Sequence, residues 1–305
     1  MAAVLDKRLL LVSGKGGVGK STVAAALAQA SARAGYKTLI CEVNAQERIS
    51  RLLGKPELGP EISLVDDHLW GVNVRPEEAM REYALMTLKF KTVYKAVFEN
   101  RLVKYFLRFL PSVQELVLLG KILYHLQERD SGGGFRFDRV IVDAPSTGHA
   151  VTFFSVPQVL VDTVPAGPLL AEAEKMRDLL IDPGTTAAVL VALPEEMPIN
   201  ETLELEQEMR TKVRITTGAV ILNGHIPPRF SAEEQVAVAS LGEALSAMIH
   251  GHLTRERMSA EALQRLRTGQ RAPVYTLPRL YDPNFGAASI DHLSTELAAL
   301  VSESA

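Results

Sequence analysis

The sequence predicts an α/β fold: a doubly wound, mostly parallel β-sheet with a glycine-rich loop after its first strand and an inserted helical subdomain. Short, strongly apolar runs recur along the 305 residues, as expected of parallel strands that are buried on both faces. Helical patterns separate most of these runs, and this alternation favours helices on both faces of the sheet. One region, from Pro76 to Glu128, has no strand pattern and interrupts the alternation.

The expected strands follow from the apolar runs in chain order. An Ala- and Leu-rich stretch from Lys20 to Arg33 predicts a helix between the first two runs, and Gly35 stands just past it, where a helix C-cap is expected. The strands are predicted at residues 8–13, 37–43, 61–65, 69–74, 138–143, 186–193, 218–223 and 273–277, the third and fourth with weaker patterns.

The strand-free region predicts three successive helices. Its apolar residues recur with heptad-like spacing, and Pro111 suits the first turn of the third helix. We therefore expect an α/β core made of residues 1–75 and 130–305, with a helical insertion at residues 76–129.

Composition excludes several classes of function. The net charge of −3 gives no footprint for nucleic acid, and one cysteine, Cys41, permits neither a disulfide framework nor a cysteine-ligated zinc or iron–sulfur site within the chain. The first residues lack a signal-peptide pattern, and no run of ~18 apolar residues predicts a membrane span. We expect a cytoplasmic protein whose contact with a membrane, if any, is peripheral.

The glycine-rich loop carries the clearest chemical signal. Gly14, Gly19, Lys20 and Ser21 satisfy the pattern GxxxxGK[ST] between a predicted strand and a predicted helix. Backbone N–H groups of such a loop surround phosphate oxygens, the lysine reaches the β- and γ-phosphates, and the Ser hydroxyl ligates Mg²⁺. A tight turn alone would not require Lys and Ser together. The predicted nucleotide-binding residues here are Gly14, Lys15, Gly16, Gly17, Val18, Gly19, Lys20, Ser21 and Thr22, with ATP and Mg²⁺ as the cofactors.

An acidic residue ends a later strand. Asp143 follows the apolar run DRVIV and is the expected partner of Ser21 in the magnesium shell, although an acidic residue at a strand end can also be a simple cap. A loop rich in Ser, Thr and Gly follows it.

Two segments resemble a known ATPase class. GKGGVGKST resembles the deviant phosphate-binding loop shared by ParA and MinD, the nitrogenase iron protein, and the arsenite-pump and tail-anchored-protein-targeting ATPases. DAPSTGHA resembles the switch loop of the ArsA family, in which Thr147, Gly148 and His149 match the family ending. The chain is most similar to bacterial ArsA-like ATPases that occur as paralogous pairs.

The resemblance implies further roles. In this class two subunits face each other, so Lys20 is expected to serve its own nucleotide and Lys15 the nucleotide of the opposite subunit. Asn223 and Pro278 match the adenine-contacting positions of the family, and residues 193–205 match a segment near the dimer partner. For His149 the resemblance implies a signalling role in the switch loop. A loop histidine that is simply hydrogen-bonded to backbone explains the same residue equally well.

The chain departs from the family in two places. Cys41 alone cannot hold arsenite or a zinc clamp across a dimer, so neither is expected. Asn44 stands where the family has an aspartate that positions the attacking water, and an amide orients water without accepting its proton. Slow turnover and a long-lived closed dimer are therefore predicted. Glu42 or Glu47 could substitute, or a paralogue could supply the competent half of a heterodimer.

The insertion matches the region that forms a client groove in the tail-anchor ATPases. Apolar side chains there suit a variable hydrophobic helix, but helices that simply pack on each other would show the same pattern. The candidate groove residues are Met80, Met86, Phe90, Phe98 and Phe106.

The favoured reading is a dimeric Mg²⁺-dependent ATPase that couples hydrolysis to opening and closing for the handling or targeting of a client protein. A slow, nucleotide-gated scaffold within a heterodimer is the alternative. A positioning ATPase of the ParA or MinD kind is weaker, because net charge and the helical insertion speak against it.

Overall fold

The computed structural model describes residues 6–43, 48–87, 113–238 and 243–302 of the chain. Its centre is an eight-stranded sheet in the order β3-β4-β2-β5-β1-β6-β7-β8, which is parallel except for β3. The strands are β1 (Leu9–Gly14), β2 (Thr38–Val43), β3 (Ser63–Asp66), β4 (Leu69–Val74), β5 (Arg139–Asp143), β6 (Thr186–Ala192), β7 (Thr217–His225) and β8 (Val274–Pro278).

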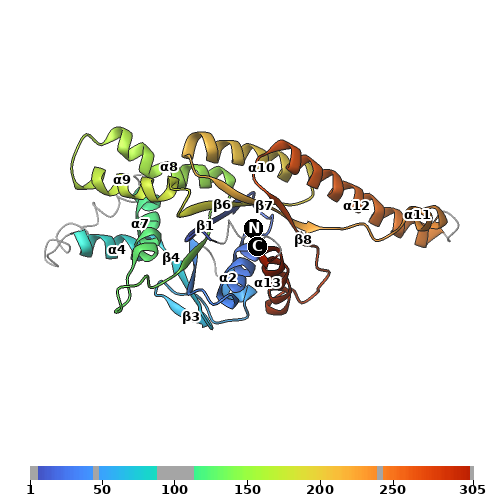
Figure 1. Ribbon diagram of the computed structural model, residues 1–305, viewed down its shortest axis with the longest axis horizontal. Coiled ribbons are helices and arrows are strands. Elements are labelled where there is room, and N and C mark those ends of the chain that lie inside the picture. Colours follow the sequence, from blue (N-terminus) through green and yellow to red (C-terminus); the bar gives the residue numbers. More distant parts are fainter. Residues whose placement is uncertain (1–5, 44–47, 88–112, 239–242, 303–305) are drawn as a thin grey trace.

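Helices cover both faces of this sheet (Figure 1). The described helices are α2 (Lys20–Arg33), α3 (Arg48–Leu52), α4 (Pro76–Thr87), α7 (Val113–Gln127), α8 (Thr147–Thr163), α9 (Pro168–Ile181), α10 (Glu196–Glu208), the π-helical turn η1 (Met209–Val213), α11 (Ala232–Val238), α12 (Glu243–Gly269) and α13 (Ala287–Ser302). The fold class predicted from the sequence is confirmed, and each predicted strand coincides with an observed strand to within a few residues.

The period of two along β1 divides the core into two layers. Leu9 and Leu11 belong to the cluster that includes α7, α8 and α10, whereas Leu10 and Val12 belong to the cluster that includes α2, α3 and α13. All four side chains are fully buried. Figure 1 shows the same division, with α2 and α13 on one side of the sheet and α8 and α10 on the other. Because the strands other than β3 are parallel, their carboxyl ends lie along the same edge of the sheet.

The end of α2 follows the predicted C-cap. Gly35 has φ 87°, and the next residue, Tyr36, donates its N–H to the Ser31 carbonyl at 3.3 Å. This left-handed glycine termination supplies donors to the carbonyls of Ala30, Ser31 and Ala32 at the end of the helix.

The predicted helical insertion is described at its two ends, α4 and α7, whereas Pro111 and the expected middle helix lie outside the described residues. Ile122 and Leu126 of α7 are fully buried in the same cluster as Leu9, so α7 packs on the sheet itself. α4 packs against α7. The division into a core of residues 1–75 and 130–305 and a helical insertion of residues 76–129 stays a prediction. None of the described helices has the length and apolar composition that crossing a bilayer requires.

Candidate functional site

The loop that joins β1 to α2 lies at the carboxyl edge of the sheet and requires glycine at both ends. Gly19 has φ 90°, and a Cβ placed there would lie 2.3 Å from Nδ2 of Asn223. A Cβ on Gly14 would lie 2.4 Å from the carbonyl oxygen of Val191 in β6. Because α2 starts directly after this loop, its unpaired backbone N–H groups and its positive dipole end face the same space. Such a loop is suited to hold an anion.

Lys20, the first residue of α2, is directed back over the loop. Its Nζ donates a hydrogen bond to the Lys15 carbonyl at 3.0 Å. Burial lowers the pKa of the Lys20 ammonium, and the nearby Asp143 carboxylate acts in the opposite direction. The lysine thus has an internal hydrogen bond that a phosphate oxygen could replace.

Ser21 and Asp143, the predicted magnesium ligands, are in direct contact. The Ser21 hydroxyl donates to Oδ2 of Asp143 at 2.6 Å. Asp143 is 8% exposed, and its Oδ1 has no hydrogen-bond partner among the described residues. Burial raises the pKa of the Asp143 carboxyl to about 6, although the Ser21 hydrogen bond and Lys20 act against that rise. Burial of the ionised carboxylate therefore costs free energy, and attraction to a bound cation would offset that cost.

A second carboxylate stands beside Asp143. Glu42 of β2 is paired in register with Asp143 of β5 and is fully buried. Its Oε1 accepts the backbone N–H groups of Arg48 and Ile49, at 2.8 and 2.9 Å. Its Oε2 has no hydrogen-bond partner in the described part of the chain. Two buried carboxylates, each with an unpartnered oxygen, and a serine hydroxyl form the oxygen-rich donor set that Mg²⁺ prefers, so the residues fit this ion.

Lys15 is paired within its own chain. Its Nζ lies 2.5 Å from Oε1 of Glu201 in α10, and the two side chains are 31% and 29% exposed. No sequence pattern singles out Glu201, although residues 193–205 are predicted to lie near a dimer partner. The predicted contact of Lys15 with another subunit's nucleotide stays a prediction.

Asn223 and Pro278, the two predicted adenine contacts, lie near the carboxyl ends of neighbouring strands. Asn223 of β7 donates its Nδ2 to the carbonyl oxygen of Val18 in the glycine loop at 2.9 Å. Pro278 ends β8 and is in register with His225 of β7. The Asn223 amide thus connects the glycine loop to the edge formed by β7 and β8.

The remaining predicted residues are less fully described. Gly148 and His149 are exposed in the first turn of α8, directly after the loop that follows Asp143. Met80 is half-buried and packs against the core. Outside the described residues are Asn44, Glu47, Phe90, Phe98 and Phe106, and the side chains of Thr147 and Met86 are likewise not described.

Comparison with known proteins assigns the family. A sequence profile of the ArsA family, described as anion-transporting ATPases, matches residues 7–165 and 168–239, which is most of the chain. The chain belongs to the ArsA ATPase family. ATPase BagA of Mycobacterium tuberculosis is 34% identical over 241 residues, which cover 77% of this chain and 70% of BagA. ATPase GET3 of Kluyveromyces lactis is 24% identical over 237 residues, covering 66% and 68% of the two chains.

A third ArsA-like relative agrees with this assignment. ATPase GET3C of Arabidopsis thaliana is 23% identical over 274 residues, which cover 74% of this chain and 69% of that protein. All three relatives are named ATPases. Membership in the ArsA family therefore confirms the resemblance drawn from the glycine loop and the segment after β5.

Proposed function

We propose that this ArsA-family chain binds ATP with Mg²⁺ at the glycine loop and hydrolyses the bond between its β- and γ-phosphates. The contact that carries the proposal is the 2.6 Å hydrogen bond between Ser21 and Asp143, which joins the start of α2 to the end of β5. The unpartnered oxygens of Asp143 and Glu42 support it, because water or a cation is needed to satisfy them.

The residues would divide the work as follows. The glycine-loop N–H groups hold the β-phosphate, and Lys20 exchanges its bond to the Lys15 carbonyl for one to a phosphate oxygen. Ser21 and Asp143 would hold Mg²⁺, and Glu42, on the neighbouring strand beside Asp143, would add a second carboxylate to the site. When bound, Mg²⁺ neutralises charge on the β- and γ-phosphate oxygens. Asn223 keeps the glycine loop against β7 while its Oδ1 accepts from the adenine amino group.

The test measures nucleotide binding and hydrolysis separately. Fluorescent ATP titration reports affinity, and phosphate release reports hydrolysis, each with and without Mg²⁺. Asp143→Asn and Ser21→Ala should lose the Mg²⁺-dependent part of both signals. Asp162→Asn, at an exposed position of α8, and Ser155→Ala, at a half-buried position of the same helix, are the matched controls and should leave both unchanged. If Asp143→Asn hydrolyses ATP at the native rate, this assignment is wrong.

We also propose that hydrolysis requires a second subunit, either a copy of this chain or a paralogue. Family resemblance supports this, as does the partial exposure of Lys15 at the rim of the glycine loop. Light scattering should give a dimer with a nonhydrolysable ATP analogue and Mg²⁺ and a smaller species with ADP. A monomer under every nucleotide condition, alone and mixed with a sister chain, would contradict it.

The output of this cycle is proposed to be the handling of a client protein through residues 76–129. The packing of α4 on α7, and of α7 on the sheet, supports a mechanical connection between that region and the strands that carry the site. A transmembrane-helix peptide should bind with an affinity that changes between the ATP and ADP states. An equal peptide affinity in the ATP and ADP states would contradict the proposed coupling.

A further inference from the structure

A second pocket lies at the opposite edge of the sheet from the glycine loop. It opens at the amino ends of β7 and β8, beside the carboxyl end of α10, and has a volume of about 330 Å³. Glu206 and Ile215 form its floor, at 7% and 0% exposed. Arg210 and Arg271 line its walls from the solvent side. Nothing in the proposed ATPase cycle uses this pocket.

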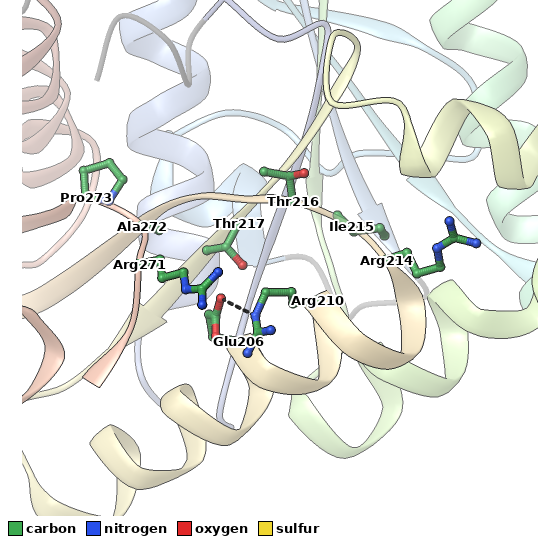
Figure 2. Close-up of a pocket in the computed structure, with 9 residues that line it drawn as sticks. All are labelled: Glu206, Arg210, Arg214, Ile215, Thr216, Thr217, Arg271, Ala272 and Pro273. Atoms are coloured by element: carbon green, nitrogen blue, oxygen red, sulfur yellow. Dashed lines mark ion pairs between the residues drawn. The ribbon is translucent and has the colours of Figure 1, made fainter. Parts of the chain in front are cut away.

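The polar groups of the pocket converge on one space. Figure 2 shows the guanidinium groups of Arg210 and Arg271 and the hydroxyl of Thr217 arranged around the Glu206 carboxylate, while the Arg214 side chain extends away from them at the rim. These residues come from three separate segments: the end of α10 with η1, the start of β7, and the turn before β8. Their convergence is thus a product of the tertiary fold.

An unusual helix end forms one side of the pocket. α10 passes into the π-helical turn Met209–Val213, and Arg214 then takes the left-handed conformation, φ 65° and ψ 24°, that glycine adopts at lower cost. The N–H of Ile215 bonds back to the Met209 carbonyl at 3.0 Å and closes the turn. Isolated π-turns of this kind occur frequently at functional sites.

Positive charge in the pocket exceeds negative charge. Arg210 and Glu206 form a loose ion pair, 3.5 Å between Nε and Oε1. Within the described part of the chain, neither the Arg214 nor the Arg271 side chain forms a hydrogen bond or an ion pair. The hydroxyl oxygen of Thr217 is buried and has no partner among the described residues. One carboxylate therefore faces the guanidinium groups of Arg210 and Arg271, with Arg214 at the rim, and a buried hydroxyl lacks its hydrogen bond.

We propose that this pocket binds the phosphate group of a small molecule. Arginine donates two parallel hydrogen bonds to phosphate oxygens, and Thr217 can add a third donor at the pocket floor. The pocket volume lies at the lower end of the range for small-molecule pockets. Apolar atoms of Ile215 and Ala272 line the pocket and can contact a small organic portion of the ligand beside the phosphate. Free phosphate, a soluble phosphomonoester and a phospholipid headgroup share this chemistry.

Because the glycine loop also attracts phosphate, the experiment blocks it in two ways. Isothermal titration uses the full chain saturated with ADP and Mg²⁺, and is repeated on Lys20→Ala, so the result does not depend on the proposed ATPase function. The probes are inorganic phosphate, ribose 5-phosphate and dioctanoyl phosphatidate. Their relative affinities identify which source of phosphate the pocket prefers.

The variants have opposite expected signs. Arg271→Gln should weaken binding of the preferred probe about tenfold, and Thr217→Val by a smaller factor. Glu206→Gln should tighten binding severalfold, because it removes the carboxylate that competes with the phosphate for Arg210. Arg257→Gln, at an exposed arginine of α12 outside the pocket, is the matched control and should have no effect.

The sign of the Glu206 effect separates binding from folding, since a damaged fold would not tighten binding. The proposal is overturned if none of the three probes binds saturably below ~10 mM. It is also overturned if Arg271→Gln and Glu206→Gln change the affinity in the same direction.

Discussion

The Lys15 ammonium lies 2.5 Å from the Glu201 carboxylate of the same chain, although the two residues are 186 positions apart. Each side chain is about one-third exposed, so the pair stabilises the structure by roughly 1 kcal/mol or less. The contact is therefore strong enough to orient Lys15 and weak enough to be exchanged for a phosphate. In the proposed dimer, Lys15 must leave Glu201 before it can reach another subunit's nucleotide.

Glu201→Gln is expected to favour this exchange. With the carboxylate neutralised, the ATP-dependent dimer should form at lower protein concentration and hydrolysis should rise by up to about fivefold, the equivalent of roughly 1 kcal/mol. Light scattering and phosphate release measure the two effects. Glu204→Gln, an exposed carboxylate on the same helix, is the control. A loss of activity in Glu201→Gln as deep as that of Lys15→Ala would mean that Glu201 is needed in the active state.

The stability of the nucleotide-free protein should depend on pH through Asp143. Burial raises the pKa of this carboxyl from 3.8 to about 6, so the folded state favours the protonated form. The associated stability is fully present below pH 3.8 and is lost as the pH rises through about 6.

Asp143→Asn, which cannot ionise, tests this dependence. In urea without Mg²⁺ it should exceed the native protein in unfolding free energy by about 3 kcal/mol at pH 8, with a gap that shrinks toward pH 4, given 1.36 kcal/mol per pKa unit. Asp162→Asn provides the control for a general charge effect. A gap that is the same at both pH values would refute the pKa assignment.

Gly19→Ala is expected to distort the glycine loop. The new methyl group would meet Nδ2 of Asn223 at 2.3 Å, at a φ of 90° that alanine adopts only with strain. A loss of about 1–3 kcal/mol in unfolding free energy and of most ATP affinity should follow. Gly16→Ala is the control for the fold, because a Cβ there meets no atom within 4 Å. Partial recovery of stability in Gly19→Ala with Asn223→Ala would establish the clash; native stability in Gly19→Ala would exclude it.

Asn44→Asp tests the predicted slow turnover. An aspartate can accept a proton from the attacking water, so the single-turnover rate should rise about tenfold or more. ATP affinity should stay unchanged, since the substitution concerns the chemical step. A native rate already equal to that of the variant would show that Asn44 does not limit hydrolysis.

Local patterns predicted much of this protein. The strands of the core are continuous apolar runs, and the ends of α2 are marked by Gly19 and Gly35, so residues close in sequence suffice to place them. The contact between Ser21 and Asp143 could be predicted because Ser21 follows a recognisable glycine loop and Asp143 ends a recognisable strand. Parallel strands bring their carboxyl ends to one edge of the sheet.

The sequence by itself determined the α/β class, the glycine loop and the family, because these depend on composition and spacing within short segments. Only the tertiary structure decided that Glu42 stands beside Asp143, that Glu201 holds Lys15, and that Arg210 and Arg271 share a pocket. Those contacts depend on strand order and on how α10 packs across the sheet. No local pattern specifies which distant side chains such packing brings within a few ångströms of each other.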